Sequence, residues 1–91
     1  MSASYTASGE INSEVTDPAA TINTVADRYA TIPGAHLDRL DGLTVTLDTG
    51  WFNLRPSNTE PLLRLNVEAP DPATMTSLRD DVLTLIEDTA S

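Results

Sequence analysis

A run of seven residues, 55–61, brings together side chains that are well suited to holding an anion. Arg55 carries a planar fork of donors that fits two oxygens of a phosphate group at once. Ser57 and Thr59 add hydroxyl donors, and Asn58 adds amide donors and tolerates the left-handed backbone conformation that tight loops need. Backbone N–H groups along the same stretch can turn inward to form an anion nest. This segment therefore predicts a phosphate-binding loop.

The same segment also fits a second interpretation, in which it is a stiff polar connection between two strands. Pro56 and Pro61 limit its conformations, which reduces the entropy lost when a ligand binds but suits a structural loop equally well. The hydroxyl and amide side chains can also bond to their own backbone through local turns. Glu60 opposes an anion site unless its carboxylate points away or pairs with an arginine. Composition alone leaves both interpretations open.

Charge is distributed unevenly along the chain. Fourteen Asp and Glu residues face five arginines and no lysine, which gives a net charge of −9. Residues 1–48 and 68–91 each carry a net charge of −5, whereas residues 49–67 carry +1. Buried strands also have few charges, so the contrast fits either interpretation. A chain this acidic lacks the basic surface that nucleic acids and anionic membranes require, so neither is an expected partner.

Several kinds of chemistry are excluded by composition. There is no cysteine for a disulfide, a thiolate nucleophile or a metal site, and the single histidine, His36, cannot form a histidine-rich metal cage. We expect His36 to be a surface or strand-edge residue. The apolar runs are far shorter than the ~20 residues that span a bilayer, and residues 1–8 do not resemble a signal peptide. The default expectation is a soluble cytoplasmic domain.

Helix signals occur at two places in the chain. The Asp-Pro pair at 17–18 is typical of a helix start, and apolar residues at three- and four-residue spacing continue toward a Pro-Gly stop at 33–34. The Pro-Asp-Pro sequence at 70–72 predicts the start of a second helix. We expect residues 1–8 to be a flexible N-terminal remnant and residues 9–91 to form one domain.

Alternating apolar residues predict the strands, with turns at Asp41-Gly42 and Thr49-Gly50. The order strand, helix, three strands, helix predicts an α+β fold, a small β-α-β-β-β-α sandwich with a mainly antiparallel sheet and two helices on one face. Trp51 and Phe52 must face opposite sides of their strand, so one is expected in the core and the other could contact a neighbouring domain. The predicted extended segments are 10–15, 37–47, 51–54 and 63–67.

The residues from Arg55 to Pro61, Arg-Pro-Ser-Asn-Thr-Glu-Pro, are followed by Leu-Leu-Arg-Leu-Asn-Val-Glu-Ala. Together they resemble the phosphate-binding loop and following strand of the α-D-phosphohexomutases, nearest to the bacterial phosphomannomutase/phosphoglucomutase group. Residues 8–13 and 41–52 are also similar to the C-terminal domain of that family. The resemblance covers nearly the whole chain from Gly9 onward, and it favours the phosphate-binding interpretation of the loop.

The resemblance implies the last of four domains, with a TATA-binding-protein-like fold, in an enzyme that interconverts hexose 1-phosphate and hexose 6-phosphate. It implies that Arg55, Ser57, Asn58 and Thr59 bind the sugar phosphate that is not transferred, which is a positioning role. The implied partners are the phosphosugar and the other three domains. The resemblance also implies that the domain moves to close over the active site.

The chain departs from the family pattern in two ways. Some relatives place a further arginine at the position of Asn66, and Arg64, on the same face of an ideal strand, is the candidate for that additional phosphate contact. The serine nucleophile loop, the aspartate-rich metal loop and the Gly-Glu-x-Ser-Gly-His sugar loop of such enzymes are missing. The implied phosphoserine and Mg²⁺ therefore belong to other domains. We expect this chain to hold no catalytic residue and no metal, and to be inactive alone.

Two other functions stay open on the sequence. One is a free-standing small α+β binding module that senses a phosphorylated metabolite, and the other is an interaction domain whose loop is structural. Both would work without a parent enzyme. A mutase domain is instead expected to bind its ligand weakly when alone, because three domains are missing.

Overall fold

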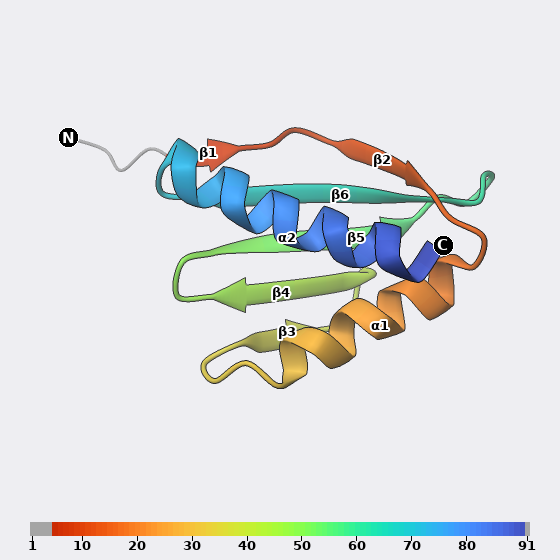
Figure 1. The fold of residues 1–91 in the computed structure, drawn as a ribbon, viewed down its shortest axis with the longest axis horizontal. Coiled ribbons are helices and arrows are strands. Elements are labelled where there is room, and N and C mark those ends of the chain that lie inside the picture. The colour runs from red at the N-terminus through yellow and green to blue at the C-terminus, as the bar shows by residue number, and fades with distance from the viewer. Residues whose placement is uncertain (1–4, 91) are drawn as a thin grey trace.

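The computed structural model describes residues 5–90 of the chain. Two helices pack against each other across one face of a single sheet, and no helix covers the other face within these residues (Figure 1). The expected α+β class, with a mainly antiparallel sheet and two helices on one face, is confirmed. The elements are β1 (Thr6–Ala7), β2 (Ile11–Glu14), α1 (Pro18–Ala30), β3 (His36–Asp38), β4 (Leu43–Leu47), β5 (Gly50–Pro56), β6 (Leu62–Ala69) and α2 (Pro72–Ala90).

Every strand pairing in the sheet is antiparallel. The strand order is β1-β6-β5-β4-β3, and β2 also pairs with β6. The four consecutive strands from β3 to β6 therefore form a meander, whereas the two N-terminal strands share the outer edge of β6. The predicted extended segment over 37–47 divides into β3 and β4 at the expected turn, where Gly42 has a left-handed φ of 68°.

The expectation for the N-terminus is wrong where the structure describes it. We expected residues 1–8 to be a flexible remnant, but Thr6–Ala7 pairs with β6 as strand β1. Ser8 fixes this edge, because its N–H donates to the Val67 carbonyl at 2.8 Å and its hydroxyl oxygen accepts the Val67 N–H at 3.0 Å. A strand of two residues has no alternating pattern that sequence analysis can detect. Residues 1–4 lie outside the described part of the chain.

Both helices begin where the aspartate–proline patterns predict. At the start of α1, the Asp17 carboxylate accepts the N–H of Ala20 at 3.1 Å. At the start of α2, Asp71 accepts the N–H of Thr74 at 2.8 Å and its hydroxyl at 3.0 Å, and these hydrogen bonds lower the pKa of Asp71 below its ordinary value. Such caps satisfy N–H groups that the first turn of a helix leaves unpaired, so they fix where each helix starts.

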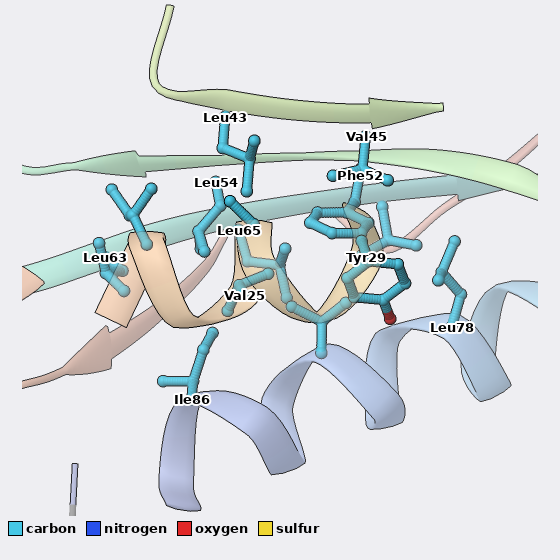
Figure 2. Close-up of a cluster of buried hydrophobic side chains, with 14 of the residues drawn as sticks. Val25, Tyr29, Leu43, Val45, Phe52, Leu54, Leu63, Leu65, Leu78 and Ile86 are labelled. Atoms are coloured by element: carbon cyan, nitrogen blue, oxygen red, sulfur yellow. The ribbon is translucent and has the colours of Figure 1, made fainter. Parts of the chain in front are cut away.

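Buried side chains from the helices and the sheet form one core (Figure 2). Phe52 of β5 is fully buried, and its ring meets that of Tyr29 from α1 edge-to-face, with centroids 5.1 Å apart and planes at 66°. Because Phe52 and Leu54 enter the core, strand alternation turns Trp51 and Arg55 to the uncovered face. The prediction that Trp51 and Phe52 face opposite ways, with one of them in the core, is confirmed.

The turn between β4 and β5 lies one residue earlier than predicted. Leu47 pairs with Gly50, so the turn residues are Asp48 and Thr49 rather than Thr49 and Gly50. Gly50 is instead the first residue of β5, where a Cβ atom would lie 2.5 Å from the carbonyl oxygen of Glu68. The glycine therefore allows β5 to pack closely on β6, and its role lies in the sheet and not in the turn.

Candidate anion-binding pocket

An open pocket of about 480 Å³ lies between the β5–β6 loop and the turn that precedes β4. The loop forms the end of the β5–β6 hairpin that is far from β1 (Figure 1). All five residues proposed from the sequence border this pocket, Arg64 included. The lining residues are Asp41, Gly42, Arg55, Pro56, Ser57, Asn58, Thr59 and Arg64. The structure thus gathers the predicted donors in one place, and their binding of a phosphate stays a prediction.

Arg55 and Arg64 lie opposite each other in the pocket wall. Strand β5 continues through Pro56, so Arg55 belongs to the end of a strand and not, as predicted, to the loop. It pairs in register with Arg64 of β6, and like charges directly opposite each other on a sheet repel. Within residues 5–90, Arg64 makes no ion pair, and its Nε atom is buried without a hydrogen-bond partner. The pocket therefore holds two positive charges that the chain does not fully neutralise.

The loop itself is ordered by its own hydrogen bonds. The Ser57 N–H donates to the Leu62 carbonyl at 2.9 Å, and the Thr59 N–H donates to the Ser57 hydroxyl oxygen at 3.3 Å. These two N–H groups are used within the loop, so the predicted nest does not form over all of residues 57–60. The local-turn interpretation is right for Ser57, yet this contact occupies only its oxygen and leaves its O–H available to donate. Glu60 is exposed and does not line the pocket.

The opposite wall of the pocket is a turn whose role sequence analysis missed. Oδ2 of Asp41 lies 3.6 Å from Nη1 of Arg55, and the two side chains are 78% and 40% exposed, respectively. Gly42 lies directly against β5, where a Cβ atom would be 2.5 Å from the Leu54 carbonyl oxygen and 2.8 Å from Cγ of Arg55. The side-chain amide of Asn53 donates to the Asp41 carbonyl at 2.9 Å. The turn and Arg55 therefore form one packed unit.

The register of the β4–β5 hairpin determines which residues meet at this wall of the pocket. Leu43 pairs with Leu54, so the next residues outward, Gly42 and Arg55, meet each other. A two-residue turn fixes this register once its position is known. The predicted turn is one residue late, and a turn there would pair Gly42 with Ser57, inside the loop, instead of placing it beside Arg55.

A larger hollow of about 800 Å³ lies on the helical side, between α1 and α2. Its charged lining residues are Asp81, Asp88 and Arg28, so negative charges outnumber the single positive charge. Burial raises the pKa of the Tyr29 hydroxyl that borders it, and the charge of Asp81 raises that pKa further. None of the five predicted site residues borders this hollow, and its carboxylates disfavour an anion there.

The remaining candidates for chemistry lie elsewhere. His36 is exposed on β3, at the edge of the sheet, as predicted. Within the described residues, no group of three or more His, Cys, Asp or Glu side chains is placed to hold a metal ion. No helix among residues 5–90 is long and apolar enough to cross a membrane.

Sequence relatives of this chain are named as mutases. The family profile described as "Phosphoglucomutase/phosphomannomutase, C-terminal domain" matches residues 10–85. Phosphomannomutase from Methanocaldococcus jannaschii is 43% identical over 82 residues, which cover 90% of this chain and 18% of that protein. Phosphomannomutase from Salmonella typhimurium is 51% identical over 67 residues, which cover 74% of this chain and 14% of that protein.

A solved structure shares the fold. The crystal structure of a phosphoglucomutase/phosphomannomutase family protein from Burkholderia thailandensis matches with a TM-score of 0.71 and 23% identity, over 94% of this chain and 18% of that one. At this identity the likeness shows the fold alone. The chain spans less than a fifth of the length of these relatives. As the resemblance predicted, the chain belongs to the phosphoglucomutase/phosphomannomutase family, and the part of the family that it matches is the C-terminal domain.

Proposed function

We propose that this chain is the substrate-phosphate-binding domain of a phosphomannomutase or phosphoglucomutase, an enzyme that interconverts hexose 1-phosphate and hexose 6-phosphate. In this proposal the pocket binds the phosphate that is not transferred. Relatives named phosphomannomutase support the enzyme class. The observation that supports anion binding most directly is the pairing of Arg55 with Arg64 in the pocket wall. These two positive charges lie together in a chain whose net charge is −9.

The charge balance of the pocket favours a phosphate dianion. Asp41 offsets part of the charge of Arg55, and Arg64 has no such partner in the described chain. A phosphate group carries enough charge for both guanidinium groups, and its oxygens accept from them in the paired geometry that arginine offers. The buried Nε of Arg64 has no hydrogen-bond acceptor, and leaving such a donor unpaired typically costs about 1–3 kcal/mol. An anion beside this guanidinium would supply an acceptor and recover part of that free energy.

The loop supplies neutral donors around the same volume. The hydroxyls of Ser57 and Thr59 and the amide of Asn58 border the pocket, and each can donate to a phosphate oxygen. The hydrogen bond from Ser57 to Leu62 braces the loop before any ligand binds, which lowers the entropy lost on binding. These donors would position the sugar and leave the reacting hydroxyl to other groups. Either sugar phosphate isomer presents the same phosphate to them.

The chemical steps are assigned to the rest of the proposed parent enzyme. Its reaction would use a phosphoserine and Mg²⁺, both held by other domains. Residues 5–90 offer no cluster of three or more metal-ligating side chains, so they do not fit a magnesium site and we derive no step through the ion. We further propose that the other three domains are the protein partners, that the enzyme is cytoplasmic, and that this chain alone is inactive.

The test is an NMR amide-shift titration of the 91-residue chain with mannose 1-phosphate, with mannose as the ligand control. The proposal predicts saturable shifts at residues 55–60 and at the start of β6, and none with mannose. Arg55→Gln should remove these shifts. Arg79→Gln is the matched control, because it deletes an arginine that lies on α2, outside the pocket, and pairs with its neighbour Asp80.

The affinity of the isolated chain for mannose 1-phosphate distinguishes a mutase domain from a free-standing metabolite sensor. Micromolar affinity in the isolated chain would favour a free-standing sensor, because a mutase domain without its partners is expected to bind weakly. The absence of any shift at tens of millimolar ligand would remove the sensor and count against the pocket in this chain. The same pair of variants in a full-length parent would then decide the mutase proposal.

A further inference from the structure

One wall of the pocket carries a negative charge that belongs to the chain itself. Asp41 is the acidic residue among the lining residues, and its Oδ2 lies 3.6 Å from Nη1 of Arg55. This separation is longer than a hydrogen bond, so the ion pair does not occupy the donors of Arg55. The carboxylate therefore lies beside the guanidinium that the proposed ligand needs, without blocking its N–H groups.

The backbone that carries this carboxylate is anchored against β5. The side-chain amide of Asn53 donates to the Asp41 carbonyl at 2.9 Å and to the hydroxyl oxygen of Thr44 at 3.0 Å. Gly42 is in contact with β5 so closely that a Cβ atom would lie 2.5 Å from the Leu54 carbonyl oxygen. The turn cannot move away from β5 without losing this packing. The backbone of Asp41 is therefore fixed beside Arg55, and its carboxylate, which is 78% exposed, stays within reach of the pocket.

We propose that Asp41 acts as a built-in counter-anion that competes with phosphate for Arg55 and so limits the affinity of the pocket. This inference rests on the proposed function, because it concerns the strength of the same site. The carboxylate stabilises Arg55 in the empty pocket and repels a phosphate that enters it. Both effects weaken binding, and the repulsion grows with the charge of the ligand. The consequence is a site that releases its phosphate readily.

The test compares Asp41→Asn with the wild-type 91-residue chain in NMR titrations with inorganic phosphate at pH 8 and low salt. Asparagine keeps the shape of the side chain and removes its charge, so we expect phosphate to bind about three- to tenfold more tightly. The matched control is Asp48→Asn, which removes another exposed carboxylate, in the turn at the other end of β4 and β5. It should leave the affinity within about twofold, because its effect is long-range and screened.

A second ligand separates competition from a structural effect. Nitrate carries half the charge of the phosphate dianion, so Asp41→Asn should improve nitrate binding by a smaller factor than phosphate binding. Added salt should reduce the gain for both ligands. A change in the shape of the pocket would alter both affinities without this dependence on charge.

The possible results have distinct meanings. If Asp41→Asn binds phosphate with unchanged or lower affinity while the wild type binds, the inference is wrong and the proposed function stands, with Asp41 then orienting Arg55. If neither chain responds to 50 mM phosphate, about fifty times a dissociation constant of 1 mM, removing the counter-anion has not created a binding site. That result overturns the inference and also counts against the proposed function.

Discussion

Replacing Arg55 with alanine should abolish phosphate binding and leave the domain folded. Within the described chain, the Arg55 side chain has two charged neighbours, the negative Asp41 and the positive Arg64. The exposed ion pair with Asp41 contributes about 0–1 kcal/mol to stability. Repulsion from Arg64 on the opposite strand costs a similar ~0.2–1 kcal/mol. Because the two nearly cancel, the free energy of unfolding should change by no more than about 1 kcal/mol.

The effect of Arg55→Ala on binding should be much larger. A hydrogen bond to a charged group contributes about 1.5–3 kcal/mol, and a guanidinium can donate two of them to one phosphate. Losing even ~3 kcal/mol lowers the affinity by about a hundredfold. In a domain that binds weakly to begin with, such a loss puts binding beyond detection.

Two measurements on the same sample check this prediction. Urea denaturation followed by circular dichroism gives the free energy of unfolding, and the amide-shift titration gives the phosphate affinity. Arg79→Ala serves as the control for the loss of one positive charge. A loss of stability above about 2 kcal/mol, or a phosphate affinity within twofold of wild type, would refute the reasoning, because Arg55 would then be a structural residue.

Three further substitutions test the fold, one beside the pocket and two away from it. Gly42→Ala would place a Cβ atom 2.5 Å from the Leu54 carbonyl oxygen, at a residue with a left-handed φ of 68°. It should therefore lower the free energy of unfolding by about 2 kcal/mol or more and weaken phosphate binding, which thermal melts and titrations would measure. Gly50→Ala should destabilise through its contact at 2.5 Å with the Glu68 carbonyl oxygen, yet the folded fraction should bind phosphate normally. Asp71 has a lowered pKa, so its stabilisation is present above the unfolded pKa and is lost as pH falls through the folded one. Asp71→Ala should therefore lower the urea midpoint at pH 7, and the difference from wild type should shrink below about pH 4.

Local sequence patterns predicted most of the fold because they act over a few residues. The aspartate–proline caps at 17–18 and 71–72 mark helix starts through hydrogen bonds that span only three residues. The alternation over 43–47 and 63–67 reports directly which side chains enter the core. The polar residues of the β5–β6 loop that line the pocket were identified for the same reason, since they are consecutive and follow such a strand.

The features that were missed depend on pairing between distant segments. Arg55 was assigned to the loop because the apolar alternation ends before it, whereas its pairing with Arg64 extends β5 beyond that point. Asp41 comes to the pocket only through the exact register of the β4–β5 hairpin, which moves by two residues when the turn is misplaced by one. Composition contains no measure of such register, so the negative wall of the pocket could be predicted only from a correctly placed turn.

The strand pairings of β6 also have a consequence for the order in which the sheet folds. Strands β3 to β6 follow one another in the chain and are joined by short connections, so their pairings close small loops at little entropic cost. The pairing of Ile11 with Leu65 closes most of the chain and includes α1 in the loop. We therefore expect the meander to nucleate folding and β1 and β2 to join its edge later. In the native state we expect amide hydrogens of β2, which pairs on one side only within the described sheet, to exchange with solvent sooner than those of β5, which has a strand on each side.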